Sequence, residues 1–208
     1  MKKILLTLVI AVSAVSLSFA STSGIRYSGE VNVGFATGNK AEYDDEMVKS
    51  SLNRPFIETI HGVTISKYTF VGAGVGVHGY FGAADKSMPE EKWNTIVLPL
   101  FVNLKGMLPL NGFTPYVTAS FGGSILPYSG FNTSFSLGGI DMKVKLTGGF
   151  YCDCGVGVKL LKKLNVGLGV QHQQMGMKIV AAYDDFKESE REEGYKGTSF
   201  YIKVGFCW

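Results

Sequence analysis

Residues 197–208 read GTSFYIKVGFCW, and the bulky apolar side chains of this segment recur at every second position. A period of two predicts a β-strand with two unlike faces. Small and polar residues, among them Lys203, occupy one face. The other face is apolar and consists of Phe200, Ile202, Val204, Phe206 and Trp208. The strand therefore needs apolar surroundings along one whole side.

The same alternation recurs in seven further segments, which predicts eight strands in all. It is plainest in TFVGAGVGVHGYFG, residues 69–82, where glycine alternates with valine and alanine. The eight segments are 24–35, 54–66, 69–82, 94–106, 113–125, 146–161, 164–179 and 197–208.

The connections between these segments alternate in length. Three are tight turns, near Lys67, Pro109 and Lys162. Four are long and polar, namely 38–53, 83–93, 126–144 and 180–194. Short turns at one end and long loops at the other are typical of barrels that cross an outer membrane, and a tilted strand needs roughly 9–11 residues to do so. We therefore predict an all-β fold, an eight-stranded antiparallel up-and-down transmembrane β-barrel.

The first twenty residues, MKKILLTLVIAVSAVSLSFA, have the build of a secretory signal peptide. Two lysines precede an apolar run, and Ser18-Phe19-Ala20 resembles a cleavage site. The alternative, an N-terminal membrane anchor, fits less well, because the apolar run of roughly 14 to 17 residues is shorter than the about 20 that a spanning helix needs. We predict a signal peptide at 1–20, a barrel domain at 21–208, and export to the cell outer membrane.

The composition agrees with an exported β protein. Glycine is frequent, with 27 residues, and aromatic residues make up 12% of the chain. Charged residues reach only 18%, against about 25% in soluble domains. The formal net charge of +3 falls to about +1 without Lys2 and Lys3, so no basic field points to a nucleic-acid partner.

The polar faces of the predicted strands carry scattered charges. In a soluble barrel a charged face would meet water, whereas here it would face a narrow interior that side chains fill. Buried charges are tolerable only when they are paired and hydrogen-bonded. We predict a polar network in the lumen formed by Arg26, Glu30, Glu58, Lys105, Asp153, Lys159 and Lys203.

No catalytic, cofactor or metal site is predicted. The three cysteines, Cys152, Cys154 and Cys207, are interpreted as free thiols, although a metal or redox site at the Cys-x-Cys pair is an alternative. The three histidines fall on different strands, where one of them would pair with a lumen carboxylate. The serines lack a histidine and acid in register, and the acidic segment 184–194 is interpreted as a solvated loop.

The chain resembles the small eight-stranded outer-membrane β-barrels of the OmpA and OmpX type, closest to the "outer membrane protein β-barrel domain" of Bacteroidetes-like bacteria. The residues that carry this resemblance are the signal peptide, FVGAGVGVHGYFG (70–82), IVLPLFVNLKG (96–106) and YIKVGFCW (201–208). The resemblance implies outer-membrane lipid and the barrel-assembly machinery as partners, with Phe206 and Trp208 as the assembly signal. A peptidoglycan-binding domain, as in full OmpA, is not expected.

The resulting hypothesis is a non-enzymatic outer-membrane barrel with a filled lumen. It would act in envelope integrity or surface interaction through its long loops, with an external partner that the sequence does not name. The alternatives are a narrow porin-like channel or small-ligand-binding barrel, an outer-membrane rim enzyme acting on lipid or peptide, and a soluble secreted ligand-binding barrel.

Overall fold

A computed structural model describes residues 24–38, 41–43, 46–48, 53–83, 93–129, 133–137, 140–161, 163–183 and 186–208. The predicted signal peptide lies outside these ranges. Within them, no helix is long and apolar enough to cross a membrane.

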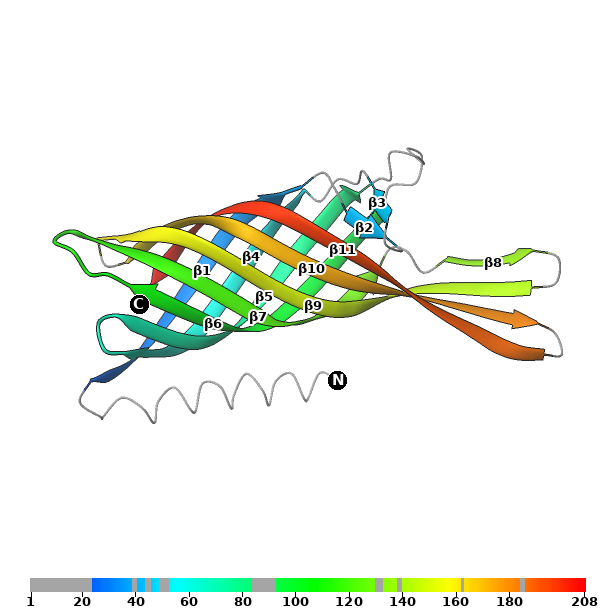
Figure 1. The fold of residues 1–208 in the computed structure, drawn as a ribbon, viewed down its shortest axis with the longest axis horizontal. Helices are drawn as coiled ribbons and strands as arrows, with labels where there is room; N and C mark the ends of the chain where they lie inside the picture. The colour runs from blue at the N-terminus through cyan, green and yellow to red at the C-terminus, as the bar shows by residue number, and fades with distance from the viewer. Residues whose placement is uncertain are drawn as a thin grey trace.

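Eight long strands form one closed antiparallel barrel (Figure 1). Each strand pairs with the next along the chain, and β1 also pairs with β11, which closes the ring. The prediction of an eight-stranded antiparallel barrel is therefore confirmed. The strands are β1 (Ile25–Thr37), β4 (Arg54–Ile65), β5 (Thr69–Ala83), β6 (Trp93–Met107), β7 (Phe113–Ser129), β9 (Ile140–Leu160), β10 (Leu164–Tyr183) and β11 (Phe186–Cys207).

Closure between β1 and β11 brings the two ends of the barrel chain together. The amide of Gly29 donates to the carbonyl of Trp208 at 3.1 Å, and the amide of Trp208 donates to the carbonyl of Gly29 at 3.0 Å. A side chain at position 29 would collide with the indole ring of Trp208. Glycine at this position therefore leaves room for the ring that covers the seam.

The last four barrel strands, β7, β9, β10 and β11, are each at least four residues longer than predicted. Two segments expected to be loops, 126–144 and 180–194, largely continue as paired strands, so the loop prediction was wrong there. The acidic segment forms a hairpin with β10, in which Met177 pairs with Glu193 and Tyr183 with Phe186. Alternation of apolar residues marks only the part of a strand with unlike faces, so backbone pairing beyond that part leaves no such signal.

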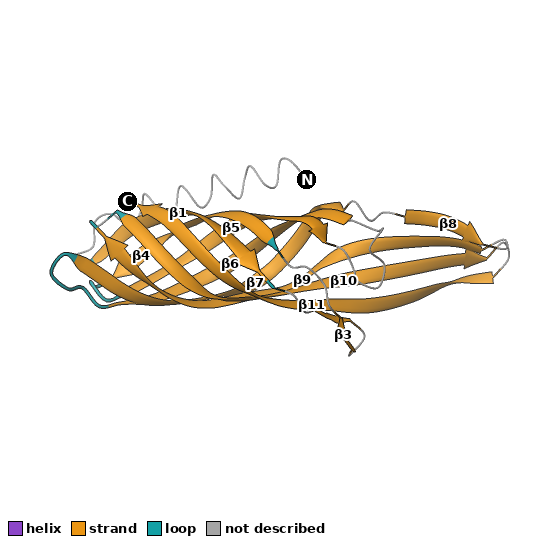
Figure 2. Cartoon of the chain, turned by 90° about the horizontal axis from the view of Figure 1, so that it is seen from above, coloured by secondary structure: helices purple, strands orange, loops and turns teal. Residues whose placement is uncertain are grey.

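These extensions form an arm beyond one end of the barrel. β9, β10 and β11 run on together, and the short strand β8 (Thr133–Leu137) pairs along β9 (Figures 1 and 2). Two more short strands, β2 (Ala41–Tyr43) and β3 (Glu46–Val48), add to the edge of β11 near the base of the arm. The tight turns lie at the opposite end of the barrel (Figure 2).

The outer face of the barrel wall is apolar. Leu168 illustrates the pattern, because it is 59% exposed and its cross-strand neighbours Val156 and Ile202 are exposed as well. The same holds for other strands, where the exposed residues include Val33, Ile57, Val75, Val77, Leu100, Val102, Val117, Phe121, Phe200 and Val204. An apolar band this extensive on a closed barrel is the kind of surface that lipid covers.

Placing a charge on this band tests whether lipid covers it. Leu168→Arg should lower the free energy of unfolding in lipid by about 2–4 kcal/mol, because an arginine in the apolar band must be desolvated. Leu161→Arg, in the exposed turn between β9 and β10, is the matched control and should cost about 0–1 kcal/mol. Urea unfolding in vesicles measures both, and equal costs at the two positions would contradict the assignment.

Candidate functional site in the barrel interior

Polar side chains fill the interior of the barrel. Most of them are amides and hydroxyls rather than charges, and they converge from every barrel strand. Those that are almost completely buried include Asn32, Arg54, Glu58, His78, Thr95, Asn103, Ser120, Asp153, Asn165, Gln171, Gln173 and Ser199. The barrel is therefore the inverse of a soluble domain, with its apolar side outward and its polar side inward.

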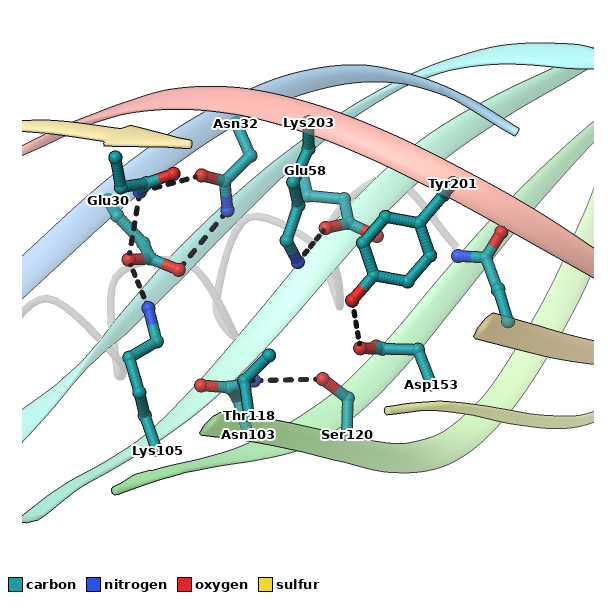
Figure 3. Close-up of polar contacts among 12 residues, drawn as sticks. Glu30, Asn32, Glu58, Asn103, Lys105, Thr118, Ser120, Asp153, Tyr201 and Lys203 are labelled. Atoms are coloured by element: carbon teal, nitrogen blue, oxygen red, sulfur yellow. Dashed lines mark hydrogen bonds and ion pairs between the residues drawn. The ribbon is translucent and has the colours of Figure 1, made fainter. Parts of the chain in front are cut away.

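Glu58 lies at the centre of this network (Figure 3). Its carboxylate faces the ammonium of Lys203 at 3.6 Å and the imidazole Nε2 of His78 at 3.3 Å. The hydroxyl of Tyr151 also donates to it, at 3.1 Å. The groups come from β4, β5, β9 and β11, so this cluster connects opposite sides of the wall. The carboxylate and the ammonium are each more than nine-tenths buried, a situation that is stable only when the charges are paired.

Two tyrosines extend the central cluster to Asp153. Tyr201 donates to the carboxylate of Asp153 at 3.3 Å (Figure 3), and Tyr151 donates to the same carboxylate at 3.2 Å. Gln171 donates to the hydroxyl of Tyr151 at 2.7 Å. Asp153 is thus held by neutral donors, and the aromatic rings of the tyrosines fill the space between the polar groups.

Arg54 extends the network towards the arm. Its guanidinium donates to the hydroxyl of Ser199 at 2.9 Å and to the side-chain oxygen of Gln171 at 2.5 Å. It also stacks over the ring of Tyr80, 4.8 Å from the ring centre. Arg54 is fully buried, so its guanidinium occupies the interior at this level.

A second ion pair lies towards the tight turns. The ammonium of Lys105 donates to Glu30 at 2.6 Å, and Asn165 and Asn32 donate to the same carboxylate (Figure 3). Nearby, Asn103 donates to the hydroxyls of Thr118 at 2.8 Å and Ser120 at 2.9 Å. Polar contacts therefore continue from the arm side of the barrel almost to the turns.

The structure places the seven residues predicted for the lumen in two groups. Five of them are buried inside the barrel, namely Glu30, Glu58, Lys105, Asp153 and Lys203. Arg26 is exposed and Lys159 is half-buried, and both line the mouth at the tight-turn end instead of the central network.

Sequence reasoning missed the neutral members of the network and Arg54. Only charged residues were predicted for the lumen, although Asn32, Gln171 and Gln173 lie on the same faces and were identifiable from their position in the alternation. Arg54 was overlooked because it is the first residue of its strand, next to Pro55. The pairing of His78 with Glu58 is one of the histidine–carboxylate pairings that the sequence left open.

Most of the other candidate residues lie on the outer face, whereas Cys207 is buried inside the barrel. Phe206 and Trp208 are both about half exposed there, and their role as an assembly signal stays a prediction. The three cysteines are free thiols, and His172 on β10 is the cross-strand partner of Cys152. Even so, no group of three metal-ligating side chains in the described ranges is arranged to hold a metal ion.

The serines considered for an enzyme make structural contacts. Ser120 accepts from Asn103, and Ser124 accepts from Gln173 at 2.7 Å and donates to the carbonyl of Gly149 at 3.1 Å. Ser129 lies at the end of β7. Neither Ser120 nor Ser124 is hydrogen-bonded to a histidine.

Solved structures of outer-membrane proteins resemble this chain. The solid-state NMR structure of AlkL in lipid bilayers matches with a TM-score of 0.50 at 10% sequence identity, over 91% of this chain and 94% of AlkL. The chain has the fold of a small eight-stranded outer-membrane barrel. OprG from Pseudomonas aeruginosa matches at a TM-score of 0.49 and 11% identity over 89% of this chain and 96% of OprG. Neisserial surface protein A matches at a TM-score of 0.44 and 12% sequence identity, over 88% of this chain and 99% of that protein.

No protein-family model and no curated protein sequence matches the chain. The narrower resemblance to a Bacteroidetes family therefore stays a prediction.

The pair formed by Glu58 and Lys203 can be tested by a double-mutant cycle. Glu58→Gln and Lys203→Met should each lower the free energy of unfolding by about 3–5 kcal/mol, because each leaves one buried charge without its partner. The double variant should cost less than the two single changes together, with a coupling energy of roughly 0.5–3 kcal/mol. Lys163→Met, at an exposed turn position, is the control and should change stability by no more than about 0.5 kcal/mol. Additive effects in the cycle would show that the pair is not coupled.

Proposed function

We propose that this protein is an integral outer-membrane barrel with a sealed interior, which acts through the arm that it presents at the cell surface. The observation that carries the proposal is the combination of an apolar outer wall with buried side chains that fill the lumen. A barrel whose interior is filled by side chains has no continuous water-filled channel. Its function then depends on the parts that project from the membrane.

The arm is the part of the described chain best placed for this role. It continues β9, β10 and β11 beyond the barrel and carries β8 along its edge (Figure 2). In outer-membrane barrels the short turns face the periplasm and the long connections face outward. By that rule the arm projects from the cell, where it would contact an external surface or molecule.

The sealed interior supports a structural and surface-interaction role over the channel alternative. Arg54, Glu58 and Tyr151 are each no more than 2% exposed, and they lie across the interior with their partners from other strands. An ion passing through would have to break these hydrogen bonds in sequence. The enzyme alternative has no comparable observation in the described residues.

Display of the arm is tested with a thiol reagent that does not cross membranes. In a cysteine-free background, Ser189→Cys in the β10–β11 hairpin should react on intact cells. Leu161→Cys, in the tight turn at the opposite end, should react only after the outer membrane is permeabilised. The reverse pattern would show the opposite orientation. The proposed placement would be contradicted if both positions reacted on intact cells, or if neither reacted after permeabilisation.

A sealed lumen predicts that the protein does not conduct ions. Purified, folded protein in a planar bilayer should produce no stepwise conductance above the leak of the lipid, whereas a porin inserted from the same detergent should conduct. Gel mobility with and without boiling establishes beforehand that the sample is a folded barrel. Reproducible conductance steps from folded protein would overturn the sealed-barrel proposal in favour of a narrow channel.

A further inference from the structure

The mouth at the tight-turn end contains a cavity of about 240 Å³. We call this cavity the basic vestibule, because four of the side chains that line it are cationic and only one is anionic. The cations are Arg26, Lys67, Lys105 and Lys159, and the anion is Glu30. They come from β1, the β4–β5 turn, β6 and β9, so the fold gathers charges that lie far apart in the sequence.

Three of the four cations have no compensating charge. Lys105 is neutralised by Glu30, whose carboxylate lies 2.6 Å from the ammonium. Arg26, Lys67 and Lys159 have no carboxylate within ion-pair distance among the described residues, and the ammonium of Lys67 lies 5.1 Å from the ring centre of Tyr68. The vestibule therefore has an excess of positive charge inside a concave wall of strands, where the surroundings strengthen its attraction for an anion.

A buried hydroxyl beside the vestibule is a second feature, and it is one of several buried side-chain atoms without a hydrogen-bond partner in the described residues. Tyr116 lines the vestibule and is only 5% exposed, yet its hydroxyl has no hydrogen-bond partner. The hydroxyl lies over Gly157 and Gly167, where any larger side chain would collide with it. Buried polar groups are almost always hydrogen-bonded, and leaving one unpaired costs stability. A bound anion would accept the hydrogen bond that this hydroxyl is free to donate.

We propose that the basic vestibule is a binding site for a phosphate group on a small soluble molecule or for free phosphate. Three uncompensated cations favour a multiply charged anion over a singly charged carboxylate. The volume suits a small ion with part of its hydration, since one water takes roughly 30 Å³. The site opens inside the ring of strands, away from the lipid-facing wall. It goes beyond the proposed surface role and depends neither on the arm nor on a sealed lumen.

Inorganic phosphate is the probe. It is titrated into the full, folded protein in a phosphate-free, non-ionic detergent at constant ionic strength set by chloride, and amide chemical shifts are followed by NMR. Saturable shifts are expected at the vestibule residues Lys67, Thr114 and Lys159, and not along the arm strands. Acetate should bind at least about tenfold more weakly, because it carries one charge and fewer acceptor oxygens.

Two variants and a matched control identify the site. Lys159→Gln should weaken phosphate binding about tenfold through loss of one charge-assisted hydrogen bond, and Tyr116→Phe should weaken it several-fold through loss of the hydroxyl alone. Lys163→Gln removes the same charge from the adjoining turn, outside the vestibule, and should leave binding unchanged. Heat-dependent gel mobility confirms that each variant is folded.

The absence of saturable shifts would overturn the proposal, as would equal weakening by Lys163→Gln, which would indicate general attraction to a basic end. Equal affinity for acetate would overturn the preference for phosphate. None of these results bears on surface labelling or conductance, so failure of this proposal and failure of the proposed function can be distinguished.

Discussion

Closure of the strand ring is the constraint on which the rest of this structure depends. In a bilayer no water is present to bond a free amide or carbonyl, so every strand must find a partner on both sides. The pairing of β1 with β11, sealed by the mutual hydrogen bonds of Gly29 and Trp208, removes the last open edge of the eight-stranded ring. Only a closed ring permits the apolar outer face that the alternating strands present.

Closure also determines what the interior must contain. An eight-stranded ring is just wide enough for its own side chains, so inward-facing residues meet across the axis and must satisfy one another. Glu58 does so through Lys203, His78 and Tyr151, whereas Asp153 relies on two tyrosine hydroxyls. The neutral donors matter as much as the charges, because a buried carboxylate needs hydrogen bonds as well as a counter-ion.

Closure of the ring also explains which parts of the fold the sequence predicts and which it does not. Alternation identifies strands wherever one face meets lipid and the other a polar interior, which is why all eight barrel strands were predictable. Beyond the apolar band both faces of β10 and β11 lose that contrast, so the hairpin that includes Glu193 was taken for a loop. Partners inside the lumen depend on the stagger of the strands, which places Arg54 against Gln171, 117 residues later, and no local pattern reports that.

The balance of charges differs between the deep interior, where pairing is needed for stability, and the mouth at the tight turns, where it is not. Deep inside, the carboxylates have cations or several donors around them, and the buried Lys203 lies against Glu58. At the tight-turn mouth, Arg26 and Lys159 are reached by water, so they need no counter-ion for the barrel to fold. Folding therefore does not explain why two strands and a turn direct uncompensated cations to one cavity beside an unpartnered tyrosine hydroxyl. An anion that enters from the water at that mouth would account for both features at once.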